Sequence, residues 1–265
     1  MSYKDLTNKL EKLKLKYKDK SAIIFGNGPS INSLNIDLIR NNNNIITLTT
    51  NQIADFCINK NFSPNLYAAF FCEPLRGKKY KINMFKSINY QGNINNALIA
   101  QKNIIHFLNN NSTDCFLHDW YKVFAKSNDE STFIKPKSWD RFTDFPENAF
   151  EKYKLPKNFL WHIATTPLFQ ICFYFEIKNI AIIGQDGYFN DKSSNHYKNY
   201  MGYEHYEPKI MEISNQRINK LLDACKNYAN KKGIKIYNLS LESKFDQFKK
   251  ISFANFEKKI NSIRV

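Results

Sequence analysis

The sequence has little glycine, little cysteine and no long apolar run. It holds 8 glycines and 5 cysteines in 265 residues, and no two cysteines form a Cys-x-x-Cys pair. Neither a zinc site of the usual spacing nor a disulfide framework is therefore expected. No apolar stretch approaches the roughly 20 residues of a membrane-spanning helix, and the first twenty residues are too polar for a signal peptide. We expect a cytoplasmic protein, with peripheral contact at the inner face of the cytoplasmic membrane as an option.

Several motifs of nucleotide and metal chemistry are also missing. The sequence contains no G-x-x-x-x-G-K-[ST], no D-x-D and no H-E-x-x-H. These absences argue against a phosphate-binding loop of the P-loop kind and against a metal-dependent glycosyl transfer. A reaction at a phosphate would then depend on hydrogen bonds and cationic side chains, so we expect no metal and no cofactor.

The formal net charge of +15 favours an anionic partner, such as a nucleotide, a nucleic acid or an anionic membrane. A bias in the base composition of the gene would also enrich lysine and asparagine. The lysines are scattered and form no nucleic-acid-binding signature. We therefore expect no nucleic-acid partner, and a basic nucleic-acid-binding protein remains the non-enzymatic alternative.

Short apolar runs alternate with segments of helical length, which is typical of a parallel sheet covered on both faces. The expected fold is α/β: a Rossmann-like, mostly parallel sheet with helices on both faces, in a glycosyltransferase A-like variant with a small lid. The segment from Thr166 to Glu176 is expected to be helical. The expected strands lie at 22–25, 45–50, 66–72, 104–108, 180–183 and 234–239.

The two ends of the chain differ from its centre. Residues 1–20 form a basic amphipathic pattern and are expected to be an N-terminal helical arm. Residues 21–240 would form the catalytic domain, with a polar, aromatic lid at about 187–208. Residues 241–265 would form a basic amphipathic tail, whose apolar stripe from Phe245 to Ile263 predicts core packing or membrane contact.

Polar residues follow several expected strands. The first strand ends in Gly-Asn-Gly-Pro-Ser, whose glycines would let backbone N–H groups approach a phosphate or ribose. Carboxamides can read a base or sugar because each offers a donor and an acceptor. Ligands of parallel sheets bind beyond such strand ends. The residues expected to bind substrate here are Gly26, Asn27, Gly28, Ser30, Asn51, Gln52, Glu73, Gln185 and Asp186.

These ordered motifs resemble the bacterial sialyltransferases that modify lipooligosaccharide with CMP-activated sialic acid. The resemblance covers roughly residues 21–240 and includes G-N-G-P-S at 26–30, Asn51-Gln52, Thr165-Thr166 and the G-x-D-x-Y strand end at 184–188. It implies that Asn27 and Asn51 contact the cytidine nucleotide and sugar. It adds Thr165 and Thr166 to the substrate-binding set.

The resemblance also implies the catalytic residues. Tyr188 and Tyr197 would hydrogen-bond the departing CMP phosphate. His205 would deprotonate the acceptor hydroxyl, with His196 as the alternative base. The expected reaction is a metal-independent, inverting transfer of sialic acid or a related nonulosonic acid from a CMP-sugar to a lipid-linked surface glycan. The expected partners are this donor, a glycan or glycolipid acceptor, an anionic membrane surface and a second copy of the chain.

A second group is also similar: the proteins typified by the archaeal pterin diphosphokinase and the flagellin glycosylation accessory factors. They share a G-x-G-P-S turn and a strand that ends in G-Q-D, as at Gly184-Gln185-Asp186. This resemblance implies diphosphoryl transfer that depends on ATP and Mg²⁺, with Asp186 and Glu73 as metal ligands. A diphosphokinase or flagellin-modification factor is therefore the main alternative.

Overall fold

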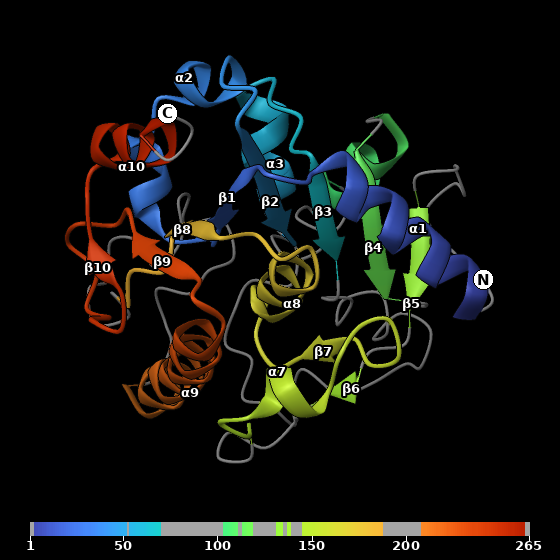
Figure 1. Cartoon of the computed structure of the whole chain (residues 1–265). Helices are drawn as coiled ribbons and strands as arrows, with labels where there is room; N and C mark the ends of the chain where they lie inside the picture. Colours follow the sequence, from blue (N-terminus) through green and yellow to red (C-terminus); the bar gives the residue numbers. More distant parts are fainter. Residues whose placement is uncertain are drawn as a thin grey trace, which may run out of the picture.

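The computed structural model describes residues 3–51, 53–69, 103–110, 113–118, 131–134, 137–138, 145–187 and 208–262. Their centre is one eight-stranded sheet with the strand order β10-β9-β8-β1-β2-β3-β4-β5, in which every paired strand is parallel to its neighbour (Figure 1). The strands are β1 (Ser21–Phe25), β2 (Ile45–Thr50), β3 (Leu66–Ala69), β4 (Asp114–His118), β5 (Ser131–Ile134), β8 (Asn179–Ile183), β9 (Lys235–Asn238) and β10 (Lys249–Lys250). A separate parallel pair joins β6 (Lys137–Ser138) to β7 (Leu160–Trp161).

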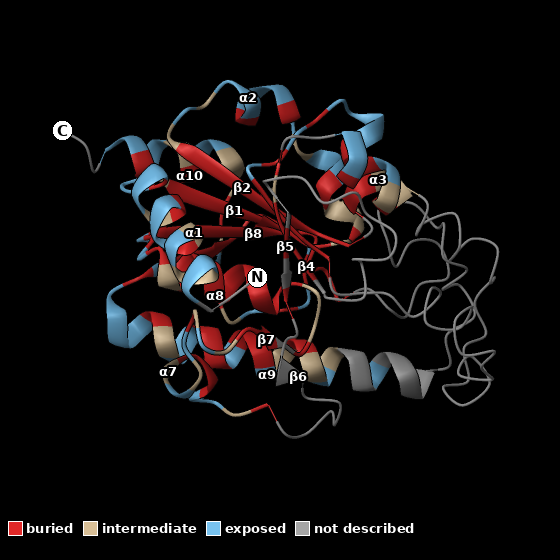
Figure 2. Cartoon of the chain, turned by 90° about the vertical axis from the view of Figure 1, so that its right-hand side faces the viewer, coloured by how far each residue is buried: buried red, intermediate tan, exposed pale blue. Residues whose placement is uncertain are grey.

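Helices cover both faces of the sheet, so the expected Rossmann-like α/β fold is confirmed (Figure 2). On one face lie α1 (Tyr3–Lys16), α7 (Ala149–Lys152), α8 (Thr166–Tyr174) and α9 (Pro208–Lys232). On the other lie α2 (Ile36–Arg40), α3 (Ile53–Asn59), the helical residues 103–110 and α10 (Phe253–Asn261). None of the described helices is both long and apolar enough to cross a membrane.

The neighbouring strands β1 and β8 are largely apolar because each one faces two hydrophobic layers. In β1, Ala22 and Ile24 join the cluster under α1, α8 and α9, whereas Ile23 and Phe25 join the cluster under α2, α3 and α10. This alternation is the two-residue period of a strand. All five residues of β1 are buried, which places it in the middle of the protein.

One of the expected strands is a helix. Residues 103–110 are helical, and the buried Ile104, Phe107 and Leu108 have the spacing of one helix face. The apolar run at 104–108 thus has helical and not strand periodicity. Strands β4 and β5 were not predicted, because they are short and carry polar residues.

Both chain ends pack on the sheet. Leu10, Leu13 and Tyr17 of α1 are buried in the core. At the other end, α10 begins only at Phe253, with the Ser252 side chain accepting from the Asn255 N–H at its start. Phe245 and Phe248 are buried but precede the helix. The prediction of one helical stripe from 245 to 263 was therefore wrong. The division into arm, domain and tail stays a prediction.

The packing of α1 predicts a contrast between two of its leucines. Leu10 is fully buried, whereas Leu15 is 72% exposed. Leu10→Ala should lower the free energy of unfolding by about 2–5 kcal/mol, because it leaves a cavity in the core. Leu15→Ala should change it by less than about 0.5 kcal/mol. Urea denaturation followed by circular dichroism measures both values, and equal values would show that α1 does not dock on the sheet.

Candidate functional site

The candidate site lies where the strand order reverses. From β1 the chain proceeds through β2, β3, β4 and β5 on one side, whereas β8, β9 and β10 lie on the other side. The carboxyl ends of β1 and β8 therefore flank the topological switch point, which is where open parallel sheets bind ligands. Residues 26–30 follow β1, and residues 184–187 follow β8.

The turns that follow β1 and β8 are in direct backbone contact. The Gly26 N–H donates to the Ile183 carbonyl at 2.7 Å, and the Gly28 N–H donates to the Gly184 carbonyl at 2.8 Å. A Cβ on Gly26 would collide with the Gly184 carbonyl oxygen, and a Cβ on Gly28 would collide with the Asp186 carboxylate. These glycines are needed because the two turns leave no room for a side chain.

A hydrogen-bonded clamp of Ser30, Gly184, Asp186 and Ser240 holds the turns together. The Ser30 N–H donates to Asp186 Oδ2 at 2.8 Å, and the Ser30 hydroxyl donates to Asp186 Oδ1 at 2.6 Å. Ser30 Oγ also accepts from the Gly184 N–H at 2.9 Å and lies 2.6 Å from Ser240 Oγ. Asp186 is 4% exposed, and both of its oxygens are used in this clamp.

The clamp changes the expected role of the Gly-Asn-Gly turn. The N–H groups of Gly26, Gly28 and Ser30 all donate to acceptors within the protein. These three amides therefore stabilise the β1–β8 junction and do not point at a space that a phosphate could occupy. The turn is a structural joint between two strands, and its side chains are what it can offer to a ligand.

Three further predicted residues come together beside the clamp. Gln185 Nε2 donates to Thr165 Oγ1 at 3.2 Å, just before α8 begins at Thr166. The Thr166 hydroxyl oxygen accepts from the Ile163 N–H at 3.0 Å. All three predicted side chains are buried, so they join the start of α8 to the end of β8.

Two carboxamide residues end neighbouring strands at the switch point. The β1–β2 pairing extends to Ile24↔Leu48, and Asn27 and Asn51 follow the ends of these two strands. Asn27 is partly exposed between its two glycines. Asn51 has φ 45°, a left-handed conformation that asparagine tolerates better than most residues. The Asn51 backbone is fixed there, because its N–H donates to the Ala68 carbonyl and its carbonyl accepts from the Tyr67 hydroxyl.

The other predicted site residues lie outside the described residues, as does most of the expected lid. They are Gln52, Glu73, Tyr188, His196, Tyr197 and His205. Within the described part of the chain, no three His, Cys, Asp or Glu side chains are grouped so that they could hold a metal ion.

The sequence analysis missed the serines that follow β9. Ser240 belongs to the clamp, and the Ser243 hydroxyl donates to the Gln185 carbonyl at 2.7 Å. Their signal was available, since both follow an expected strand at its carboxyl end. Beside them is a pocket of about 550 Å³, whose lining includes Ser30, Ser33, Asp186, Ser240 and Glu242.

The close contact of the turns predicts that Gly28 tolerates no side chain. Gly28→Ala should lower the free energy of unfolding by about 3 kcal/mol or more, because its Cβ would displace the Asp186 carboxylate from two hydrogen bonds. Gly233→Ala is the matched control, since Gly233 has φ 62° and a Cβ there meets nothing within 4 Å. The control should cost only about 1–2 kcal/mol of backbone strain. Equal losses in urea denaturation would contradict the role of the Gly28 contact.

Comparison with known proteins revises the expected function. A family model described as 6-hydroxymethylpterin diphosphokinase MptE-like matches residues 1–192 of the 265. A search of curated proteins gave no match. The expected sialyltransferase that uses CMP-sialic acid in lipooligosaccharide synthesis is therefore wrong, and the related group is the better match.

The structure explains why the motifs misled. The glycines at 26 and 28 and the G-Q-D strand end pack against each other to join β1 to β8. Such a contact is set by the sheet and carries no information about a sugar donor. The chain belongs to the 6-hydroxymethylpterin diphosphokinase MptE-like family.

Proposed function

We propose that the chain binds a nucleotide beyond the carboxyl ends of β1, β2 and β8 and transfers a diphosphate group from it to a hydroxyl group. The observation that carries this proposal is the position of Asn27 and Asn51 at neighbouring strand ends beside the switch point. The family description, which names a diphosphokinase, supplies the reaction class. A hydroxymethyl group on a pterin is the first acceptor to test.

The reaction balances without a redox partner. The acceptor oxygen attacks the β-phosphorus of a nucleoside triphosphate, and the bond from that phosphorus to the oxygen of the α-phosphate breaks. The nucleoside monophosphate leaves with the bonding electrons, and the acceptor proton passes to water or a basic side chain. The products are a diphosphate ester and a nucleoside monophosphate.

The described residues support the binding part of this reaction. Asn27 is partly exposed but its Oδ1 atom is buried, so the amide NH₂ is the group that would contact a base or ribose. The clamp of Ser30, Gly184, Asp186 and Ser240 fixes the two turns, so a ligand would meet a preorganised edge. The hydroxyl-lined pocket next to the clamp offers further partners for an acceptor or a sugar.

Diphosphoryl transfer from ATP commonly involves Mg²⁺, but the described residues do not fit that ion. Asp186 is buried and uses both carboxylate oxygens to accept from Ser30. We therefore derive no step through a metal, and Asp186 acts here as a structural carboxylate.

A non-catalytic accessory role, such as that of a flagellin-modification factor, is the second candidate. It is favoured by the same engagement of Asp186 and of the amides of Gly26, Gly28 and Ser30. A phosphate or metal would need these groups, and they are already bonded within the protein. The two candidates differ in turnover, because an accessory factor would bind a nucleotide without releasing its monophosphate.

Nucleotide binding should depend on Asn27. Asn27→Ala should weaken binding of ATP by about tenfold, because it removes the amide donor at the strand end. The free energy of unfolding should fall by no more than about 1.5 kcal/mol, since the glycines make the turn contacts. Asn230→Ala, the same substitution at an exposed position of α9, is the control. Titration calorimetry with ATP, ADP, GTP and CMP, each with and without Mg²⁺, measures the affinities.

Turnover is measured by ³¹P NMR with ATP, Mg²⁺ and 6-hydroxymethylpterin. Formation of AMP with a diphosphate ester supports the enzyme, and nucleotide binding without AMP supports the accessory role. Nucleotide binding that is equally strong in the native chain, Asn27→Ala and Asn230→Ala would place the nucleotide away from this edge and overturn the proposed site.

A further inference from the structure

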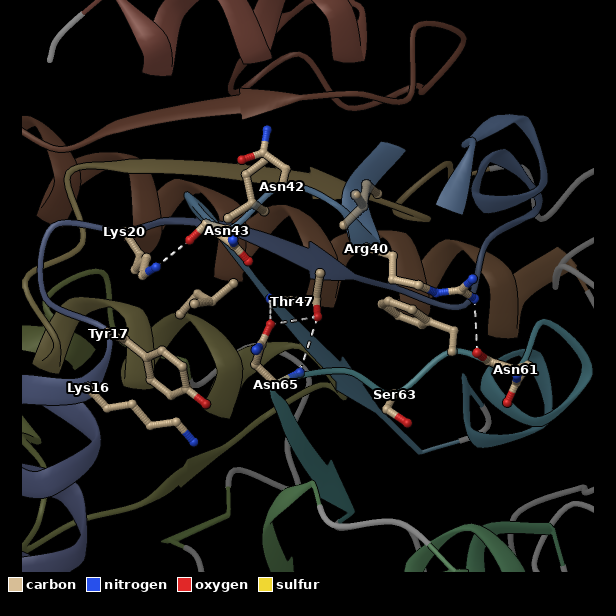
Figure 3. A pocket seen from close by; sticks show the side chains of 14 residues that line it. Lys16, Tyr17, Lys20, Arg40, Asn42, Asn43, Thr47, Asn61, Ser63 and Asn65 are labelled. Carbon is tan, nitrogen blue, oxygen red and sulfur yellow. Dashed lines mark hydrogen bonds between the residues drawn. The ribbon is translucent and has the colours of Figure 1, made fainter. Parts of the chain in front are cut away.

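A second candidate site lies at the amino edge of the sheet, opposite the strand ends described above. This amino-edge pocket has a volume of about 560 Å³. Its walls come from the end of α1, the end of α2 and the segment between α3 and β3 (Figure 3). Lys20, Asn43 and Asn65 lie just before β1, β2 and β3, respectively. No function assigned above uses this pocket.

The charge of the amino-edge pocket is of one sign. Lys16, Lys20 and Arg40 line it, and none of the 14 lining residues is Asp or Glu. Carboxylates of residues outside the lining reach three of its members: Asp37 pairs with Arg40, Asp114 pairs with Lys16, and Glu257 accepts from the Asn42 amide at 2.9 Å. The lining itself has three cations and no acidic residue, and such a concave surface attracts an anion.

The three cations differ in how far the protein already uses them. Arg40 is tied down, because it pairs with Asp37 at 2.9 Å and donates to the carbonyls of Lys60 and Asn61 at 3.1 and 2.9 Å. Lys20 donates to the Asn43 carbonyl, and no described carboxylate pairs with it. Each ammonium has three N–H donors, so Lys20 keeps donors for a ligand.

Lys16 adds a second ammonium at the other side of the pocket. Its only ion pair within the described residues is a long one, 3.4 Å from Asp114, and its side chain is 59% exposed. Burial acts to lower the pKa of Lys16, but its contacts with Tyr17 and Asp114 outweigh this and raise it. The ammonium therefore stays charged.

Neutral donors complete the wall between the lysines. The Asn65 carboxamide oxygen accepts from the N–H and hydroxyl of Thr47 at 2.8 and 3.1 Å, which fixes the orientation of the amide (Figure 3). The Tyr17 hydroxyl lies beside Asn65 and Lys16. Burial raises the pKa of Tyr17 above its ordinary value of 10.0, so this hydroxyl remains protonated.

We propose that the amino-edge pocket binds the phosphate monoester group of a small molecule or of a lipid. Lysine is a common phosphate ligand, and a doubly charged group with three terminal oxygens suits two ammonium groups. The volume falls in the range of about 300–1,000 Å³ of small-molecule pockets, so it exceeds the need of phosphate alone. Ile39, Ile45 and Phe62 give the pocket an apolar part for the rest of the ligand.

The phosphate monoester that binds this pocket could belong to a soluble molecule or to a membrane lipid. Leu15 and Leu38, which neighbour Lys16 and Ile39 in the sequence, are 72% and 52% exposed. Exposed leucines beside a cationic pocket are suited to the surface of an anionic bilayer. The phosphate chemistry is the same for both sources, and the experiment separates them.

The test compares two double variants with equal loss of charge. Lys16→Gln with Lys20→Gln removes both pocket ammonium groups. Lys12→Gln with Lys18→Gln removes two exposed lysines of the same segment that do not line the pocket. Titration calorimetry uses phenyl phosphate and inorganic phosphate. Co-sedimentation uses phosphatidylcholine vesicles with and without phosphatidic acid.

We expect phenyl phosphate to bind more tightly than inorganic phosphate, and the pocket variant to weaken phenyl phosphate binding about tenfold. The control variant should change it by less than about twofold. Phosphatidic acid binding that is lost only in the pocket variant identifies a lipid headgroup. Phenyl phosphate binding without vesicle binding identifies a soluble ester.

Equal losses in the two double variants would overturn the proposal, because net charge alone would explain them. Failure of the native chain to bind either phosphate monoester source would also overturn it. If the pocket variant does not fold, Lys20→Gln alone takes its place, because Lys20 has no carboxylate partner among the described residues. Asn27→Ala should leave phenyl phosphate binding unchanged. The outcome of the phenyl phosphate experiment is therefore independent of the outcome of the ATP titration that tests the proposed function.

Discussion

The contact between the turns after β1 and β8 is the constraint on which the rest of the structure depends. Two backbones meet there without any intervening side chain, and the Asp186 carboxylate closes the joint by accepting twice from Ser30. This joint fixes β1, in the middle of the sheet, to β8, the first of the strands on the other side of the switch point. The strand ends that could receive a ligand, including that of β2 with Asn51, take their positions from this joint.

The two edges of the sheet have different chemistry. At the carboxyl edge, carboxamides, hydroxyls and one buried carboxylate surround the switch point, and they suit a ligand recognised by hydrogen bonds. At the amino edge, Lys16, Lys20 and Arg40 line a pocket that has no acidic residue in its lining and that suits an anion. Part of the formal charge of +15 is therefore concentrated in one concave surface.

The sequence predicted the fold more accurately than the site. Strands β1, β2 and β8 were predicted because each is a short apolar run buried on both faces. The run at 104–108 was misjudged because a strand and a short amphipathic helix look alike over five residues. Gly26 and Gly28 were predicted to contact a ligand, and the structure shows that they contact the backbone at Gly184, more than 150 residues away in the chain. A one-dimensional pattern could not show that the glycines face that partner and not a phosphate.

The place of β1 in the sheet also has a consequence during synthesis on the ribosome. β1 is synthesised early, whereas its partner β8 is synthesised much later. The turns that follow the two strands meet at Ser30 and Asp186, which are 156 residues apart in the chain. Until β8 emerges, one edge of a strand that is fully buried in the folded protein has no partner. Such an edge favours intermolecular pairing. The nascent chain is therefore expected to depend on chaperones, and truncation before residue 179 should yield aggregates and not a smaller folded domain.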